Sequence, residues 1–155
     1  MPEATHEQVK LMLDLFELRR EARLRQARTW FTSNFQAANA EEMAKKYPMG
    51  GEESVNVRMV ATYWDMVANI ANRGLLHEEL FFETTGEQWF VWERLKHLVP
   101  AMREMLKNPH MWEALEEHCR RLEAWRERRS PGSAEAMRQM MQKVMQAHAG
   151  NKASS

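Results

Sequence analysis

The amino-acid sequence predicts an all-α protein, a helical bundle of five to seven helices that ends in a Met-rich helix. The acidic residues are the first indication, because 20 of the 22 are glutamate, which favours helices more than aspartate does. The second is that apolar residues recur three and four positions apart along most of the chain. The third is that the six glycines and five prolines lie mostly between these periodic segments, where they end helices.

Length and composition limit the class of protein. A chain of 155 residues suits one domain and buries roughly 70% of its unfolded surface without a metal or disulfide. Lys and Arg balance Asp and Glu at 22 each, which argues against a general polyanion binder. Cys119 is the only cysteine, so no internal disulfide forms and we expect a cytoplasmic protein. The chain does not start like a signal peptide, and no apolar run reaches the roughly 20 residues of a transmembrane segment.

The first helix is predicted to begin at Thr5, because Thr5 and Gln8 have the spacing of a capping box. Its apolar positions keep helical spacing as far as Phe31, so we expect one long helix. A short polar helix over Ala40–Lys46 follows, with Asn39 as its N-cap. The stretch YPMGGEES then carries the Pro and Gly residues that end it.

A longer helix is predicted over about Glu52–Arg73, and it ends in the stretch ANRGLLHEEL. Gly74 lies where a left-handed C-terminal cap belongs, so it is the candidate structural corner. Glu78 and Glu79 then fall in the first turn of a short helix over residues 77–84, where the helix dipole favours negative charge.

A helix over residues 87–107 is predicted next, and Pro100 should kink it or divide it after Leu98. Asn108 and Pro109 form a restart signal, an N-cap followed by proline at the first helical position. Together these signals predict two more bundle helices before the linker.

The domain boundary is predicted after residue 129. Residues 1–129 should form the helical bundle, and residues 130–155 a linker, an amphipathic helix capped by Ser133 and a disordered tail from Gly150. The aromatic residues on the inward stripes are the predicted core, and they are Phe16, Trp30, Trp64, Trp92, Trp112 and Trp125.

Three segments carry a family resemblance: LFELRREARLRQARTWF, YWDMVANIANRGLLHEELFFETTGEQWFVWERLKHLVPAMRE and the part from Trp112 to Trp125. Over about Leu11 to Trp125 the chain resembles a bacterial domain family of unknown function with small all-helical members. The shared pattern is an Arg-rich first helix, a W-x-x-(V/I)-A helix ending in R-G-L-L-x-E-x-L, and a following W-x-x-L helix. Several relatives place a membrane helix ahead of this domain. The resemblance implies an all-helical fold and brings no known activity.

Two acidic groups could bind metal, and each also has a structural interpretation. His77, Glu78 and Glu79 are consecutive, so on a helix they point to different faces, whereas a helical metal pair needs ligands three or four apart. The structural corner is therefore favoured. The acidic segment over residues 113–118 lacks the E-x-x-H spacing of di-iron bundles, so we predict no metal residues.

His118 and Cys119 could form a nucleophile pair. Neighbours on a helix diverge by about 100°, however, so a buried thiol that packs as a small hydrophobe is favoured. The chain contains no Gly-rich phosphate loop and no nucleophile elbow. We therefore predict no catalytic residues, no cofactor and no enzymatic activity.

Two Arg-rich blocks are candidate charged faces. The first consists of Arg19, Arg20, Arg23, Arg25 and Arg28, and five arginines between residues 120 and 129 form the second. Such blocks could contact phosphates, which makes a nucleic-acid-associated regulator the alternative function. The stretch from His77 to Glu93 has five glutamates and no Lys or Arg. Solvated faces, or ion pairs with this stretch within the chain or across a dimer, are therefore favoured over nucleic acid.

The Met-rich last helix is the candidate partner-binding surface, through Met137, Met140, Met141, Val144 and Met145. Methionine is unbranched and adapts to irregular surfaces. The helix could dock on its own bundle, lie in the groove of a partner or a second copy, or lie on a membrane surface. We predict a non-catalytic protein that acts through protein–protein interaction or self-association, with a protein partner or homo-oligomer rather than nucleic acid.

Overall fold

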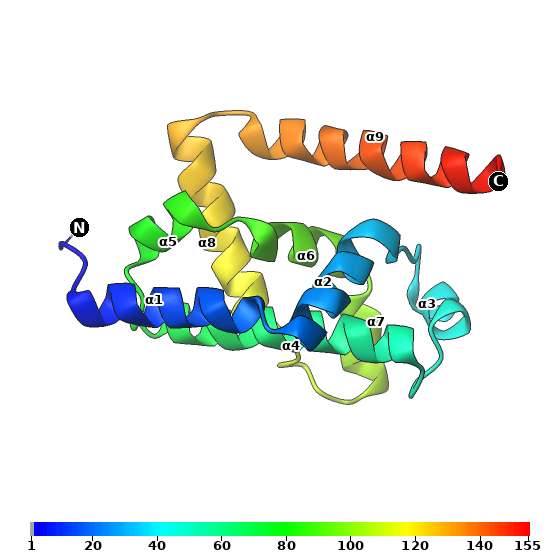
Figure 1. Ribbon diagram of the computed structural model, residues 1–155, viewed down its shortest axis with the longest axis horizontal. Helices are drawn as coiled ribbons and strands as arrows, with labels where there is room; N and C mark the ends of the chain where they lie inside the picture. Colours follow the sequence, from blue (N-terminus) through cyan, green and yellow to red (C-terminus); the bar gives the residue numbers. More distant parts are fainter. Residues whose placement is uncertain (1) are drawn as a thin grey trace. The chain divides into compact units, whose positions relative to one another are not determined.

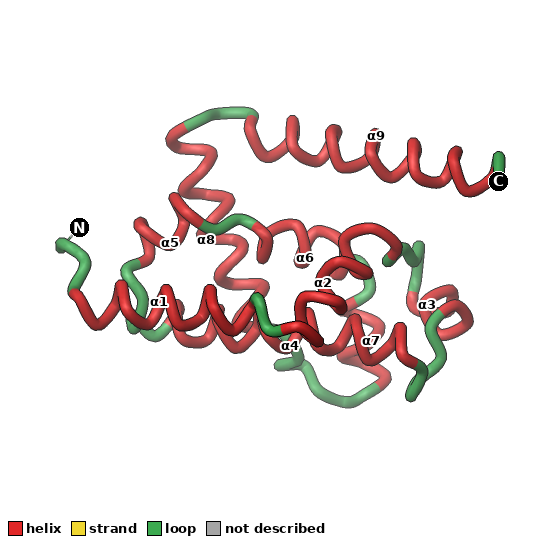
Figure 2. The backbone as a smooth tube through the Cα atoms, viewed as in Figure 1, coloured by secondary structure: helices red, strands yellow, loops and turns green. Residues whose placement is uncertain are grey.

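The computed structural model describes residues 2–155, and these residues form helices and no strand. The predicted all-α class is confirmed. In chain order the helices are α1 His6–Arg19, α2 Ala22–Asn34, α3 Ala40–Lys46, α4 Glu52–Asn72, α5 Glu78–Thr84, α6 Glu87–Leu95, α7 Val99–Met105, α8 Glu113–Arg129 and α9 Ser133–Ala153 (Figure 1, Figure 2). The described residues thus form nine helices. The predicted count of five to seven is wrong, because two of the predicted helices are each divided.

The chain divides into two compact units, one ending at Cys119 and the other over Arg120–Ser155. The division lies within α8, whereas the sequence places the boundary in the linker after residue 129. The reason is that the end of α8 contacts the start of α9, as in the hydrogen bonds between Arg138 and Glu123. Across residues 2–155, no helix has the length and apolar character needed to cross a bilayer.

α4 forms the centre of the core of the first unit. Its side chains at helical spacing are buried, and they include Val57, Val60, Trp64, Val67 and Ala71. α2 packs against α4 and buries Leu24, Ala27 and Phe31. Burial of each large apolar side chain stabilises the fold by roughly 1.5–3 kcal/mol, so this pair of helices supplies much of the stability of the unit.

The predicted aromatic core is partly correct. Trp64 and Trp112 are buried, and Trp30, Trp92 and Trp125 are half-buried. Phe16 is 46% exposed, so its prediction as a core residue is wrong. α1 instead buries Leu15, whereas its neighbour Phe16 keeps about half of its side chain at the surface.

The first predicted helix is divided at Glu21. α1 ends and α2 begins around this residue, whose ψ of 138° is not helical. The Glu21 carboxylate accepts hydrogen bonds from the backbone N–H groups of Arg23 at 3.0 Å and Leu24 at 2.9 Å. These hydrogen bonds hold the pKa of Glu21 below its ordinary value. Glutamate is not among the preferred N-caps, so the break carries no strong sequence signal.

The corner after α4 is built by local hydrogen bonds. Gly74 has φ +77°, in the left-handed region that favours glycine. The N–H of Leu75 donates to the carbonyl of Ile70 at 3.3 Å, which satisfies a carbonyl of the last turn. His77 is the N-cap of α5, and its Nδ1 accepts the N–H of Leu80 at 3.2 Å. His77 thus has a structural contact at this corner.

α8 begins at Glu113, and the predicted start at Pro109 is wrong. Trp112 has φ +55°, so the chain turns sharply before the helix. The helix is capped from another part of the chain, because the carboxylate of Asp65 in α4 accepts the N–H of Leu115 at 3.0 Å. A cap that comes from α4 has no local sequence signal.

The start and end of α9 also differ from the prediction. Gly132 is its N-cap, with φ +86°, where Ser133 was the expected cap. The carboxylate of Glu127 accepts the N–H groups of Gly132 at 2.9 Å and Ala134 at 3.0 Å, and these bonds hold its pKa below the ordinary value. α9 extends to Ala153, so most of the predicted disordered tail is helical.

Candidate functional site

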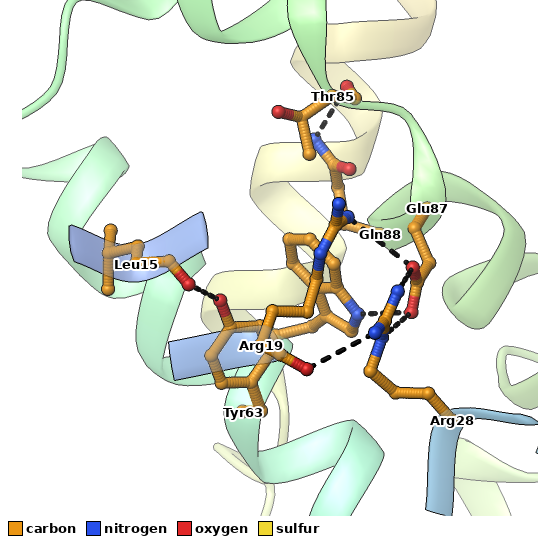
Figure 3. A network of polar contacts seen from close by, with 8 residues as sticks. Leu15, Arg19, Arg28, Tyr63, Thr85, Glu87 and Gln88 are labelled. Atoms are coloured by element: carbon orange, nitrogen blue, oxygen red, sulfur yellow. Dashed lines mark hydrogen bonds and ion pairs between the residues drawn. The ribbon is translucent and has the colours of Figure 1, made fainter. Parts of the chain in front are cut away.

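A charged network centred on Glu87 joins α1, α2, α4 and α6. Arg28 donates to both carboxylate oxygens, from Nε to Oε1 at 2.8 Å and from Nη2 to Oε2 at 2.5 Å. Arg19 donates from Nη1 to Oε2 at 3.4 Å. Trp64 donates from its indole Nε1 to Oε1 at 3.4 Å. We call these four residues the Glu87 network; Figure 3 shows both arginines beside the carboxylate.

The division of the first helix builds this network. Arg19 is the last residue of α1, and its backbone carbonyl accepts a hydrogen bond from Arg28 Nη1 at 3.2 Å (Figure 3). Glu87 is the first residue of α6, where the helix dipole favours a carboxylate. The break at Glu21 therefore lets arginines from two helices reach one acid.

The network holds more positive than negative charge. Two guanidinium groups face one carboxylate, and the side chains of Arg19, Arg28 and Glu87 are only 17%, 19% and 22% exposed. Hydrogen bonding to Glu87 raises the pKa of Arg28 above its ordinary value. Arg19 makes the long contact, and its buried Nε has no hydrogen-bond partner among residues 2–155. Arg19 is thus the less satisfied of the two cations.

A cavity of about 260 Å³ lies beside Arg19, between α1, α4 and α5. Its walls are mostly apolar, and they include Met12, Leu15, Tyr63, Trp64, Val67 and Phe81. Leu13 and Phe16 of α1 also line it and are 58% and 46% exposed, so its wall on α1 continues onto the surface of the molecule. We call it the α1–α4 cavity. It combines an apolar wall with one guanidinium group.

Tyr63 fixes α1 against α4 at the wall of this cavity. Its hydroxyl donates to the carbonyl of Leu15 at 2.5 Å (Figure 3). Burial raises the pKa of Tyr63 to about 12, since the phenolate would be poorly solvated there. The hydroxyl therefore keeps its proton and its hydrogen bond throughout the neutral range.

This raised pKa predicts a stability change at alkaline pH. An unfolded tyrosine ionises near pH 10, whereas folded Tyr63 keeps its proton to about pH 12. Between these values the unfolded state binds fewer protons, so stability falls as pH rises. Tyr63→Phe should cost about 1 kcal/mol at neutral pH and remove part of the alkaline loss. Urea unfolding at about pH 7 measures the first effect, and the change in stability between about pH 9 and pH 11 measures the second. An unchanged pH slope in the variant would contradict the assignment.

His118 and Cys119 lie beside a second buried polar group. The Nε2 atoms of Gln88 and His118 are 3.3 Å apart, and Gln88 Nε2 also donates to the carbonyl of Thr85 at 3.2 Å. The Cys119 thiol donates to the carbonyl of Gln88 at 3.4 Å and is 1% exposed. This thiol is hydrogen-bonded and closed to solvent, which agrees with its prediction as a buried residue that packs as a small hydrophobe. Within residues 2–155, no three His, Cys, Asp or Glu side chains are grouped to hold a metal ion.

The predicted charged faces are only partly brought together. Arg19 lies in the Glu87 network, Arg20 is exposed with its guanidinium carbon 5.9 Å from the ring centre of Phe16, and Arg23 is half-buried. Glu78 and Glu79 lie half-buried in the first turn of α5. From the same acidic stretch, Glu87 contacts the first Arg block. The sequence indicated that such a pairing was possible but did not single out Glu87.

The second unit carries the predicted Met surface on α9. Met137, Met141 and Met145 are half-buried, whereas Met140 and Val144 are 67% and 51% exposed. We call these five residues the Met face. The first turns of α9 are held by Arg138, whose Nη2 donates to the Glu123 carboxylate of α8 at 2.7 and 2.6 Å. The exposed part of the Met face begins one turn beyond Met137.

Comparison with known protein families assigns most of the chain to one family. Residues 4–122 match the family described as Domain of unknown function (DUF4760). The chain belongs to this family. No curated protein and no solved structure matches the chain.

The DUF4760 match agrees with the resemblance to a family of unknown function, and the description of the family names no activity. The matched residues include the whole Glu87 network and all residues that line the α1–α4 cavity. The Met face lies beyond residue 122 and thus outside the matched DUF4760 domain.

Proposed function

We propose that the protein acts without catalysis, by binding a protein surface through the Met face, and that a second copy of the chain is the first partner to test. The observation that carries this proposal is the exposure of Met140 and Val144 on one side of α9. Large apolar side chains that recur four residues apart on a helix are the pattern by which helices dock into apolar grooves. Methionine adapts such a face to surfaces of irregular shape.

The charges around the Met face suit a protein partner. From Met137 onward the chain carries Arg138, Lys143 and Lys152 and no acidic residue. Arg138 contacts Glu123, so little free positive charge remains to hold α9 on an anionic membrane. An apolar contact flanked by two lysines is the simpler role for this helix.

A nucleic-acid-associated regulator remains the alternative proposal, and it would use the Arg blocks. Arg19 and Arg28 of the first block already contact Glu87, which lowers the charge available for phosphates. Nucleic-acid binding predicts affinity that falls steeply with salt. Failure to shift DNA or RNA in a gel at about 50 mM salt would remove this alternative.

Self-association is tested by charge substitutions in the full-length chain. Met140→Glu with Val144→Glu should weaken the association at least about tenfold, because two carboxylates would be buried in the contact. The control is Gln142→Glu with Gln146→Glu, which adds the same charge at the same spacing on exposed positions of α9. Sedimentation equilibrium over a range of concentrations measures the dissociation constants. Equal effects of the two variants, or a wild-type chain that stays monomeric at about 100 μM, would contradict self-association.

A further inference from the structure

We propose that the α1–α4 cavity binds an amphipathic organic anion, a small carboxylate whose apolar tail lies in the cavity and whose headgroup pairs with Arg19. The proposal concerns the first unit and does not rest on the Met face. It joins an apolar cavity with a cation that the fold leaves incompletely satisfied.

The size and the apolar walls of the cavity determine which kind of ligand tail it can hold. The cavity has a volume of about 260 Å³, and it is open at the exposed side chains of Leu13 and Phe16, so a ligand can enter it. Drug-sized ligands occupy roughly 300–1,000 Å³, so this cavity suits a smaller molecule. Met12, Val67 and Phe81 are among its walls, and they favour an unbranched hydrocarbon chain over a polar group.

Arg19 determines the charge of the ligand headgroup. Its Nη1 makes only a 3.4 Å contact with Glu87, whereas Arg28 takes the same carboxylate at 2.8 and 2.5 Å. Its buried Nε has no hydrogen-bond partner in the part of the chain that the structure describes. A buried donor without a partner is costly, so an acceptor that reaches it gains affinity.

The charge balance favours a carboxylate. The two guanidinium groups and one carboxylate of the Glu87 network leave one net positive charge, which a single carboxylate neutralises. A carboxylate also matches the planar fork of a guanidinium group. Phe16 completes the site, because it lines the cavity and its ring centre lies 4.7 Å from the Arg19 guanidinium carbon.

Octanoate is the probe, titrated into isotope-labelled full-length protein below its micelle concentration. Calorimetry should give saturable binding of one octanoate per chain. The Trp64 indole N–H should shift in the NMR spectrum, since it lines the cavity and contacts Glu87. In the wild-type protein, the octanoate chain should give nuclear Overhauser effects to the methyl groups of Met12 and Val67, which lie in the cavity wall.

Two controls isolate the charge. Arg19→Gln should weaken octanoate binding about tenfold or more, whereas Arg58→Gln, the same charge change at an exposed residue of α4 that does not line the cavity, should leave it unchanged. 1-Octanol, which has the tail without the charge, should bind at least about tenfold more weakly than octanoate. Thermal unfolding followed by circular dichroism checks that both variants are folded. Non-saturable binding, absent Overhauser effects to Met12 and Val67, or equal binding by the two variants overturns the proposal.

Discussion

Replacing Phe31 with alanine should destabilise the protein by about 3–5 kcal/mol, the range for deleting a buried aromatic ring. Phe31 lies on α2, is 2% exposed and stacks on Phe35 with ring centres 4.8 Å apart. The guanidinium of Arg94 lies 5.3 Å from the Phe31 ring centre and also donates to the backbone carbonyl of Phe31 at 2.7 Å. The deletion would therefore leave a cavity where α2 packs on α4 and would remove the ring that Arg94 covers.

The matched control is Phe16→Ala on α1. The residue type and the change are the same, but Phe16 is 46% exposed. The expected loss is about 1 kcal/mol, from its remaining apolar contacts and from the Arg19 guanidinium beside its ring. Urea unfolding followed by circular dichroism gives both free energies. Losses of similar size for the two variants would mean that burial does not differ between these positions as the structure describes.

Features of the fold that depend on neighbouring residues could be predicted from the sequence. The caps at Thr5 and Asn39 were correct, since each depends on a hydrogen bond between residues three apart. The division before Val99 was also correct, because Pro100 lies in the first turn of α7. The core position of Trp64 was correct, because Trp64 lies on the apolar face of α4. Contacts of this kind are made between residues close in sequence, so the local sequence predicts them.

Other features depend on contacts between distant residues, and the sequence could not provide them. Periodicity does not tell how far around a helix the contact with its neighbours extends, so Phe16 was assigned to the core in error. The start of α8 depends on a cap from Asp65, which is 50 residues from Leu115. Arg19 and Arg28 lie 68 and 59 residues from Glu87. The α1–α4 cavity is a gap between packed helices, and no residue pattern encodes such a gap.

Glu87→Gln should have the other large effect, a loss of about 2–3 kcal/mol of stability. The substitution keeps the shape of the side chain and removes its charge, so two guanidinium groups stay in a mostly buried site without a counterion. Breaking a fully buried ion pair costs about 3–5 kcal/mol, and the 17–22% exposure of these side chains lowers that value. Glu17→Gln, at an exposed position of α1, is the control and should change stability by less than about 0.5 kcal/mol.

The order of effects among the three charged partners is the sharper test. Arg28→Met removes the bidentate partner, but Arg19 can still neutralise Glu87, so it should cost less than Glu87→Gln. Arg19→Met leaves the Arg28–Glu87 pair intact and should cost least. In the double variant with Glu87→Gln and Arg28→Met, one unpaired cation remains instead of two. Its loss of stability should therefore be smaller than the sum of the losses of the two single variants by about 0.5–3 kcal/mol. Additive losses, or a larger cost for Arg19→Met than for Arg28→Met, would contradict a network in which one carboxylate serves two arginines and leaves Arg19 the surplus charge.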